Sequence, residues 1–442
     1  MNPRRIAFDV LRDVTGEGAY ANLALAKRLA MAGLDARDAA FVTELVAGTS
    51  RLIGTYDLII EAASGRRLNT MQPAVVDLLR LLCHQALSMS VPGRAAVAST
   101  VELARSTVGN RVTGLVNAVG RRITEHDLGE WTARLAEGRE PIQGLAIRYH
   151  HPSWIVEAYA ELLPEGELEA ALDANNDAPR PTLVVRPGLA ERTELSPAVP
   201  TRWSPHGAVL DGNPAALPAV REGRAGVQDE ASQLVALALA GADAPPGPWL
   251  DLCAGPGGKA ALLAGLAASQ GTRLVANEVA PHRARLVEQA LQCYPEGTAT
   301  VLCSDGRKTG LLEQHGPFAK VMVDAPCSGL GALRRRPESR WRRQPSDLGE
   351  LIPLQRALLS SAVALCAPGG VIAYVTCSPH RAETTQVVEA AVVEHGLQPL
   401  EASALLPEVP DISCGSFVQF WPHRHTTDAM FLALLRVPRA GQ

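Results

Sequence analysis

Residues Asp251–Lys259 (DLCAGPGGK) decide the fold of the C-terminal half of the chain. The residues Trp249–Cys253 are apolar enough to form a buried strand, and Lys259–Ser269 has the composition of a helix. A strand that runs through dense glycines into a helix lets the backbone approach a ligand closely, because glycine has no side chain to hold the ligand away. The stretch therefore predicts an α/β fold with a ligand site at the end of this strand.

The glycine loop alone permits more than one ligand. A Walker phosphate loop is excluded, because Ala260 stands where a Ser or Thr would hold magnesium and the upstream spacing is wrong. Gly255-x-Gly257-x-x-Ala260 matches a dinucleotide loop, and Glu278 ends the next predicted strand, where a ribose-binding carboxylate belongs. The adenosyl part of S-adenosylmethionine uses the same geometry without a pyrophosphate. An ordinary strand-to-helix turn is the alternative without a ligand.

Apolar strands alternate with helices beyond this loop. Such alternation predicts a parallel sheet covered by helices on both faces, with ligands outside the carboxyl ends of the strands. The expected strands are Leu274–Glu278, Thr300–Leu302, Val321–Asp324 and Gly370–Thr376, and the expected helices are Pro281–Leu291 and Pro353–Leu365.

Two cysteines follow two of these strands. The segment VMVDAPCSGLG places Asp324 and Cys327 just beyond one strand, and VIAYVTCSPH places Cys377 at the tip of another. If the sheet is doubly wound, the two strands are neighbours and both thiols face the crevice of the glycine loop. A single cysteine is most often a small buried apolar residue, but each of these lies in a polar loop of Pro, Ser and Gly. Both are therefore candidates for chemistry, and a helix N-terminus next to a thiol can activate it.

The rest of the chain indicates two further domains. Residues 1–140 show only helical periodicity, punctuated by glycines and prolines that include Gly54, and predict an all-α bundle. Residues 145–227 combine a helix, a β-branched strand at Thr182–Arg186 and many prolines, which predicts a small α+β domain. We expect the α/β domain to span residues 228–438. The chain is then a multidomain protein with three parts.

Composition narrows the class of protein. With 442 residues and a hydrophobic fraction of 47%, the chain is globular. Lys and Arg number 42 against 46 Asp and Glu, a balance of −4 that argues against a wholly basic nucleic-acid-binding surface but not against a local one. None of the eight cysteines forms a CxxC pair, so a zinc site is not expected. The N-terminus is no signal peptide and no apolar run is long enough for a membrane span, so we expect a cytoplasmic location.

Taken in order, DLCAGPGGK, DAPCSGLG and YVTCS resemble the motifs of the RNA cytosine carbon-5 methyltransferases. The segment DARDAAFVTELVAGTSRLIGTYDLII is similar to a NusB-type RNA-binding domain, and HPSWIVEAY and VQDEASQLV are also similar to family landmarks. A NusB-like front joined to such a second half resembles the RsmB (Sun/Fmu) group of the NOL/NOP2/sun family. The resemblance implies a class I methyltransferase with a Rossmann-like fold that methylates small-subunit (16S) ribosomal RNA with S-adenosylmethionine.

The resemblance also implies roles for single residues. Cys377 would attack carbon 6 of the cytosine, Cys327 would assist product release, and Asp324 would bind the cytosine edge or the donor's amino group. The remaining cofactor-binding residues would be Cys253, Ala254, Gly255, Pro256, Gly257, Gly258 and Lys259 around the methionine part, Glu278 at the ribose, Asp305 at the adenine, and Arg283. The acid at the second strand is usually Asp rather than Glu, and DAMFLALL stands where the family more often has DGFF.

A cluster of arginines is the candidate RNA-binding surface. Arginine forks suit phosphates, and a Trp can stack on an unpaired base. The target cytosine must lie in a single-stranded loop or be flipped out of a duplex. The cluster follows directly on the Cys327 loop and contains Arg334, Arg335, Arg336, Arg340, Trp341 and Arg342.

The sequence is compatible with other functions as well. The same chemistry on tRNA or another RNA is the first alternative. An NAD-dependent oxidoreductase fits the glycine loop and Glu278, but it leaves Cys327, Cys377 and the arginines unexplained. An RNA-binding protein with a degenerate second half is opposed by the intact pair of cysteines. We expect no metal and a monomer.

Overall fold

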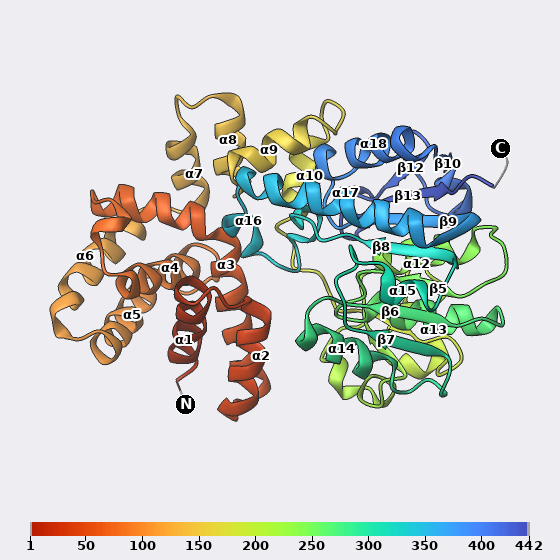
Figure 1. The fold of residues 1–442 in the computed structure, drawn as a ribbon. Coiled ribbons are helices and arrows are strands. Elements are labelled where there is room, and N and C mark those ends of the chain that lie inside the picture. The colour runs from red at the N-terminus through yellow and green to blue at the C-terminus, as the bar shows by residue number, and fades with distance from the viewer. Residues whose placement is uncertain (1, 440–442) are drawn as a thin grey trace. The chain divides into compact units, whose positions relative to one another are not determined.

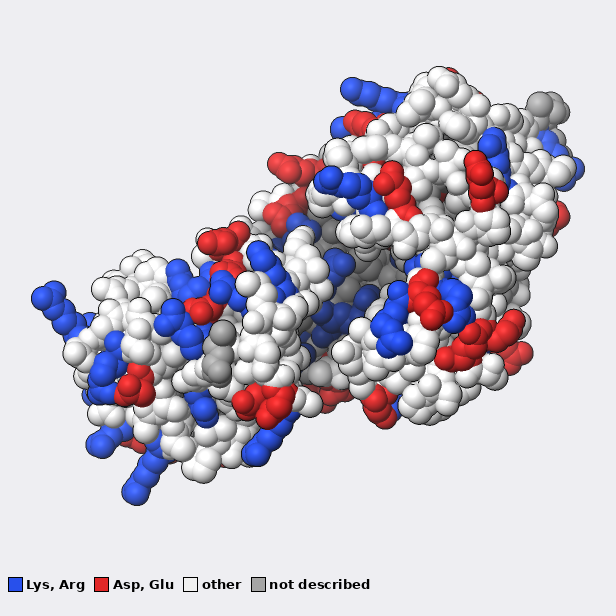
Figure 2. Space-filling model, turned by 90° about the horizontal axis from the view of Figure 1, so that it is seen from below, with Lys and Arg blue, Asp and Glu red and all other residues white. Residues whose placement is uncertain are grey.

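The computed structural model describes residues 2–439, and their contacts divide the chain into two units (Figure 1). The first unit comprises the residues up to Asp177 together with the segment Leu333–Gln344. The second comprises Ala178–Ala332 and the chain from Pro345 onward. Acidic side chains lie among basic ones on the surface that Figure 2 shows for each unit, in keeping with the nearly balanced composition.

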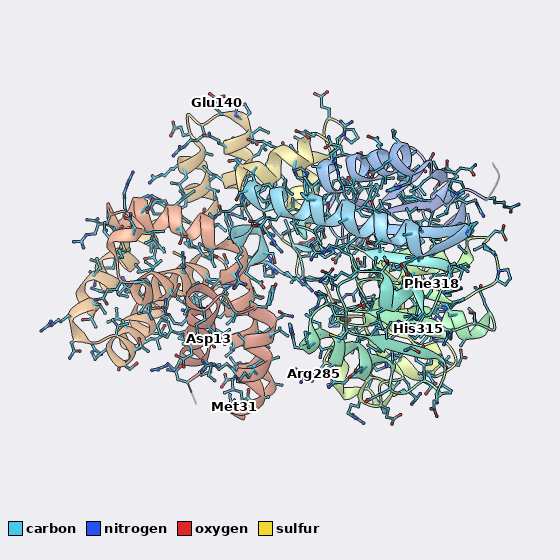
Figure 3. All side chains as sticks on the ribbon, viewed as in Figure 1. Asp13, Met31, Glu140, Arg285, His315 and Phe318 are labelled. Atoms are coloured by element: carbon cyan, nitrogen blue, oxygen red, sulfur yellow. The ribbon has the colours of Figure 1, made fainter. Side chains whose placement is uncertain are left out.

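The first unit is helical throughout, as the periodicity predicts. Its longest helix, α3, starts at the Asp35 cap, whose carboxylate accepts a hydrogen bond from the Asp38 amide at 2.8 Å, and ends at Gly65 in the left-handed conformation. Asp13, labelled in Figure 3, joins α1 to α2 through an ion pair with Arg28 at 2.9 Å. The helices are α1 (Pro3–Gly16), α2 (Ala21–Ala32), α3 (Ala36–Ser64), α4 (Pro73–Leu87), α5 (Gly93–Thr107), α6 (Thr113–Ile123), α7 (Leu128–Ala136), α8 (Pro141–Arg148), α9 (Ser153–Ala160), α10 (Leu168–Ala174) and the short α16 (Ser339–Arg342).

Gly54 does not interrupt a helix, contrary to the prediction. It lies inside α3, where a Cβ atom would come within 2.1 Å of the Trp341 ring. The absence of a side chain therefore serves the packing of a distant tryptophan on the helix rather than a turn.

The predicted α+β domain of residues 145–227 does not exist as one body. Its helices α8, α9 and α10 belong to the first unit, and only the strands after Ala178 belong to the second. Gln233 of α12 (Glu230–Gly241) donates a hydrogen bond to the carbonyl of Leu183, which ties the small sheet to the second unit. This sheet is antiparallel in the order β2-β3-β1-β4 and consists of β1 (Thr182–Val185), β2 (Val199–Pro200), β3 (Gly207–Val209) and β4 (Ala225–Val227).

The large sheet of the second unit carries the predicted parallel core. Its order is β11-β12-β13-β9-β8-β5-β6-β7, and the five strands from β9 to β7 run parallel. The chain leaves β5 toward β6 on one side and later returns through β8 on the other, which makes the carboxyl end of β5 a topological switch point. These strands are β5 (Trp249–Asp251), β6 (Leu274–Asn277), β7 (Ala299–Leu302), β8 (Phe318–Asp324) and β9 (Cys366–Thr376).

The other strands of this sheet are antiparallel, which the sequence interpretation did not anticipate. Strand β13 pairs with β9 along six residues, so the C-terminal end of the chain extends the sheet beside β9. The antiparallel strands are β10 (Gln398–Leu400), β11 (Ser413–Cys414), β12 (Phe417–Gln419) and β13 (Phe431–Arg436).

Helices cover both faces of the sheet (Figure 1). One face packs against α12, α13 (Gly258–Ser269) and α14 (Pro281–Leu291), and the other against α15 (Gly310–Glu313), α17 (Leu348–Leu365) and α18 (Thr385–His395). Two short helices, α11 (Pro218–Arg221) and α19 (Pro422–His425), complete this unit. The stretch Pro345–Leu365 is long and apolar enough to cross a membrane, but Leu358, Leu359 and Ala362 are buried in the core against the sheet.

Candidate functional site

Two cysteines meet where β8 and β9 end side by side. Asp324 ends β8 opposite Val375 of β9, and the chain continues from these positions to Cys327 and Cys377. The two sulfur atoms are 3.4 Å apart, which is hydrogen-bonding distance for thiols. The neighbouring strands predicted from the sequence are therefore confirmed, and so is the approach of both thiols to one place.

The loop after Cys327 is held tightly against the chain around Cys377. The Gly331 amide donates a hydrogen bond to the Cys377 carbonyl at 2.9 Å, and the Ala429 amide donates to the Gly331 carbonyl at 2.9 Å. A Cβ atom at Gly331 would stand 1.9 Å from the Ala429 carbonyl oxygen, so only glycine fits. This packing fixes where the two sulfurs can lie.

The two thiols have different surroundings. The pKa of Cys327 is raised well above its usual range, first by its hydrogen bond to Cys377, then by burial, and then by the charges of Cys377, Glu383 and Asp324. Cys327 therefore keeps its proton at neutral pH. The charge of Cys377 is one of the causes that raise the pKa of Lys259, so the Lys259 ammonium interacts electrostatically with Cys377.

A buried ion pair lies beside the thiols. Lys259 Nζ donates a hydrogen bond to Asp324 Oδ2 at 2.9 Å, and only 12% of the lysine side chain is exposed. Burial by itself lowers the pKa of Lys259, but the charge and hydrogen bond of Asp324 and the charge of Cys377 outweigh it, so the pKa is raised. The lysine of the glycine loop thus stays cationic beside the two cysteines.

The glycine loop is folded around the carboxylate of Glu278. Glu278 Oε2 accepts a hydrogen bond from the Gly255 amide at 3.0 Å, and Oε1 accepts one from the Ala280 amide at 3.0 Å. Arg283 donates to the Gly255 carbonyl and lies 3.5 Å from Glu278 Oε2. A Cβ atom at Gly255 would be 2.2 Å from Glu278 Oε2, and Gly257 has a φ of 111°. The predicted cofactor-binding residues Gly255, Glu278 and Arg283 are thus in direct contact with each other.

Asp305 follows β7 by three residues, and its carboxylate is hydrogen-bonded to Arg307. Arg307 donates its guanidinium N–H groups to both Asp305 oxygens, at 2.9 Å and 2.7 Å. These bonds and the Arg307 amide lower the pKa of Asp305 to about 2. A ligand at this position must share Asp305 with Arg307 or displace it.

Asp251, the first residue of DLCAGPGGK, is a site residue that the sequence interpretation missed. It ends β5 with no exposed surface, and neither oxygen has a hydrogen-bond partner of ordinary geometry among the described residues. Burial and then the charge of Asp324 raise its pKa to about 7, against smaller lowering effects of Lys259 and the Cys253 amide. An unpartnered carboxylate at the switch point is a polar group that a bound ligand can satisfy. Its place as the last residue of a strand before the glycine loop was the available signal.

The raised pKa of Asp251 predicts a pH-dependent stability. A carboxyl group that is harder to ionise in the folded state binds its proton more tightly there, so the free energy of unfolding falls as pH rises from about 4 to about 7. The change attributable to Asp251 is about 4 kcal/mol. The free energy of unfolding of Asp251→Asn, measured with urea, should lack this part of the decline with pH. The control Asp243→Asn changes an exposed carboxylate and should keep the decline. Parallel pH profiles for Asp251→Asn and wild type would contradict the prediction.

The predicted RNA-binding cluster is wrong at three positions. Arg340, Trp341 and Arg342 donate hydrogen bonds to backbone carbonyls of the first unit instead of forming an open RNA-binding surface. Arg340 is fully buried and donates to the carbonyls of His150 and Asn175, both at 2.9 Å, and its burial lowers its pKa to about 9. Trp341 Nε1 donates to the Arg51 carbonyl at 2.9 Å.

Arg342 donates to the carbonyls of Val14 and Gly18, each at 3.0 Å. Arg340 and Arg342 satisfy carbonyls near helix ends and in loops of the first unit, an arrangement that sequence spacing does not reveal. Arg334 is also buried, whereas Arg335 and Arg336 are exposed.

Family models match both ends of the chain. The model described as 16S rRNA methyltransferase RsmB/F matches residues 236–436, and the NusB family model matches residues 1–125. The first covers the large sheet with all the site residues above, and the second covers α1 to α6.

Similarity to individual proteins extends over the whole chain. A putative methyltransferase of Mycobacterium tuberculosis is 48% identical over 98% of this chain and 96% of its own. The ribosomal RNA small subunit methyltransferase B of Vibrio cholerae is 31% identical over 86% of each chain. Among solved structures, the one titled PH0851 matches with a TM-score of 0.80 at 24% identity over 98% of this chain and 99% of that one, which supports the same fold.

These findings decide between the ligands that the glycine loop left open. S-adenosylmethionine is the cofactor, and the NAD-dependent alternative is set aside. The residues fit this cofactor: the glycines leave no room for side chains, Glu278 lies at the end of the second parallel strand, and Asp251 has unsatisfied oxygens at the switch point. The chain belongs to the RsmB/F family of methyltransferases, with a NusB-family domain ahead of the methyltransferase domain.

Proposed function

We propose that this protein methylates carbon 5 of a cytosine in small-subunit (16S) ribosomal RNA, through a covalent adduct between Cys377 and carbon 6 of the base. The observation that supports this chemistry best is the pair of thiols 3.4 Å apart at the ends of β8 and β9, beside the Lys259–Asp324 ion pair. S-adenosylmethionine supplies the methyl group when bound.

The chemistry requires a nucleophile because carbon 5 of cytosine is itself a weak one. The Cys377 thiolate, which interacts electrostatically with the Lys259 ammonium, forms a bond to carbon 6, and the electron pair displaced onto carbon 5 makes that carbon nucleophilic. After carbon 5 has gained the methyl group, a base removes its proton. The bond between sulfur and carbon 6 then breaks, and Cys377 leaves as a thiolate. Cys327, which holds a proton beside Cys377, assists this release.

The proposal also assigns residues to each part of the cofactor. Residues Cys253–Lys259 would hold the methionine part of the cofactor, Glu278 and Arg283 the ribose, and Asp305 the adenine. Glu278 already fixes the loop through the Gly255 and Ala280 amides, so its acceptor sites are oriented before the cofactor arrives. Asp324 Oδ1 has no hydrogen-bond partner among the described residues and would accept from the cytosine amino group or from the donor.

The tight fit at Gly255 predicts loss of cofactor binding on a small substitution. In Gly255→Ala the new methyl group would collide with Glu278 Oε2 and Arg283 Nε, which must move from the ribose site. We expect the affinity for S-adenosylmethionine to fall about 10-fold or more, which corresponds to about 1.4 kcal/mol. Calorimetric titration measures this directly. Gly310→Ala, where a Cβ atom would meet nothing within 4 Å, is the matched control and should bind normally.

The RNA substrate is inferred from the relatives. Those named ribosomal RNA small subunit methyltransferase B cover most of this chain, and the NusB-family domain supplies a second surface for RNA. The exposed Arg335 and Arg336 remain as phosphate contacts of the predicted cluster. The target cytosine would be unpaired or flipped out of its stack, and the enzyme would act as a monomer in the cytoplasm.

The proposal is tested by transfer of labelled methyl groups from S-adenosylmethionine to purified RNA. Ribosomal RNA from a strain that lacks the corresponding enzyme should gain 5-methylcytosine at a defined position in the small-subunit RNA, and tRNA should gain none. Methylation of tRNA alone would assign the same chemistry to another substrate. No incorporation into any of these RNAs, with cofactor binding intact, would overturn the proposed function.

A further inference from the structure

The buried carboxylate of Glu383 connects the two cysteine loops. Glu383 lies in the turn between β9 and α18 and has no exposed surface. Its Oε2 accepts hydrogen bonds from the hydroxyls of Ser328 and Ser378, the latter at 2.8 Å. Ser328 directly follows Cys327, and Ser378 directly follows Cys377. One carboxylate oxygen therefore holds the residue next to each thiol.

The other oxygen of Glu383 reinforces this arrangement. Oε1 accepts the Ser328 amide at 2.8 Å and Gln355 Nε2 at 3.0 Å. Gln355 also donates to the carbonyl of Pro326, so the Cys327 loop is fixed on both sides of the cysteine. The carboxylate thus receives four hydrogen bonds, three of which involve the backbone or hydroxyl of a residue adjacent to a cysteine. Burying a carboxylate is costly, and four donors satisfy it only if both loops keep this conformation.

The two serine hydroxyls do not make the same connection without Glu383. They lie 3.0 Å apart, but each hydroxyl has one hydrogen to donate. The Ser378 hydroxyl also accepts from the His380 amide at 3.2 Å, so its own hydrogen is free for Glu383. Among the described residues, Glu383 Oε2 accepts from both hydroxyls, and it adds a side-chain connection to the backbone bond between Gly331 and Cys377.

We infer that Glu383 is a positioning residue of the methyl-transfer site: by binding the residue after each cysteine, its carboxylate sets the separation of the Cys327 and Cys377 thiols. The Glu383 carboxylate is fully buried, and its hydrogen-bond partners are Ser328, Ser378 and Gln355, so it would act through the two loops. The inference rests on the proposed cysteine chemistry for its catalytic consequence, but the positioning itself is independent of the substrate. A second effect follows from its charge, which is one of the causes that raise the pKa of Cys327.

The decisive variant is Glu383→Gln, which keeps the size of the side chain. Its amide oxygen can still accept at one position, but its NH₂ group meets the serine hydroxyls as a donor, so the shared acceptor is lost. We expect kcat to fall about 10- to 100-fold while KM for S-adenosylmethionine stays unchanged, since displacement of reacting groups by about 1 Å has effects of this size. Glu389→Gln, at an exposed position on α18, is the matched control and should behave as wild type.

A second measurement reports on the thiols without any RNA. With their sulfurs 3.4 Å apart, Cys327 and Cys377 should be joined rapidly to a disulfide by the thiol oxidant diamide, which removes two electrons and two protons from the pair. In Glu383→Gln this reaction should be about 10-fold slower or more. Mass spectrometry of peptides measures the rate, and thermal unfolding verifies that the variant is folded.

The outcomes separate this inference from the proposed function. If wild type methylates no RNA but Glu383→Gln slows disulfide formation, the positioning stands and the proposed function fails. If wild type methylates RNA and Glu383→Gln matches it in kcat and in disulfide formation, the inference is overturned. Should Glu383→Gln fail to fold, Ser328→Ala and Ser378→Ala each remove one donor to Oε2 and should each slow both reactions; wild-type rates in both variants would equally overturn the inference.

Discussion

Replacement of Cys377 by alanine will abolish methyl transfer while cofactor binding remains. The thiolate forms the bond that makes carbon 5 reactive, and the thiol hydrogen-bonded to it is that of Cys327. Cys327 is an inadequate substitute because its raised pKa keeps it protonated. We expect a loss of about 10⁴-fold or more in kcat, equivalent to about 5 kcal/mol of transition-state stabilisation. Single-turnover transfer of labelled methyl groups measures this loss.

Two measurements make the Cys377→Ala result specific. Calorimetry should show unchanged affinity for S-adenosylmethionine, because Glu278 holds the glycine loop through the Gly255 and Ala280 amides, and these bonds remain in the variant. Cys293→Ala removes a half-buried thiol whose partner is the Glu222 carbonyl, and it should retain full activity. Normal turnover by Cys377→Ala would show that the nucleophile has been assigned to the wrong cysteine.

Replacement of Cys327 by alanine should have the opposite signature: the enzyme attacks its substrate but does not release it. Cys327 is the protonated neighbour of Cys377, and its removal leaves the first bond-forming step intact. We therefore expect a covalent complex of protein and RNA to accumulate in place of free methylated product, with turnover reduced about 100-fold or more. A denaturing gel of the reaction with labelled RNA reveals the complex as a slowly migrating band.

The double variant provides the control for this adduct. Cys327→Ala combined with Cys377→Ala should form no covalent complex, because the attacking thiol is absent. A Cys327→Ala enzyme that turns over normally and leaves no adduct would remove the role in release from Cys327. An adduct that persists in the double variant would place the attacking group on another residue.

The pattern of strands and motifs predicted much of the site because each of its parts is local. The parallel core, the loops after β5, β8 and β9, and the meeting of Cys327 with Cys377 follow from alternation and from the rule that parallel strands end at one edge. Asp251 was missed as a site residue although it begins the deciding stretch, because its significance is its burial without partners. Burial depends on what the helices and strands cover, not on the residue's neighbours in the chain.

The arginine-rich segment shows why a run of positive charge in the sequence does not by itself identify an RNA-binding surface. Arg340 donates to Asn175, 165 residues away, and Trp341 packs on Gly54 of α3. A run of arginines after a catalytic loop is equally compatible with RNA binding and with satisfying buried carbonyls. Which of these holds depends on whether carbonyls of another part of the chain lie within reach, because a guanidinium offers five donors to any acceptor that surrounds it.

The sequence by itself determined the fold class and the family, and it located the glycine loop and the two cysteines at the ends of strands, because hydrophobic periodicity, strand order and the need for glycine are properties of short stretches of sequence. The tertiary structure alone decided the division of the chain after Asp177, the burial of Arg340 and the hydrogen bonds of Glu383 to both serines. These features depend on hydrogen bonds and contacts between residues that are distant in the chain. A buried polar group is stable only where the fold supplies its hydrogen-bond partners.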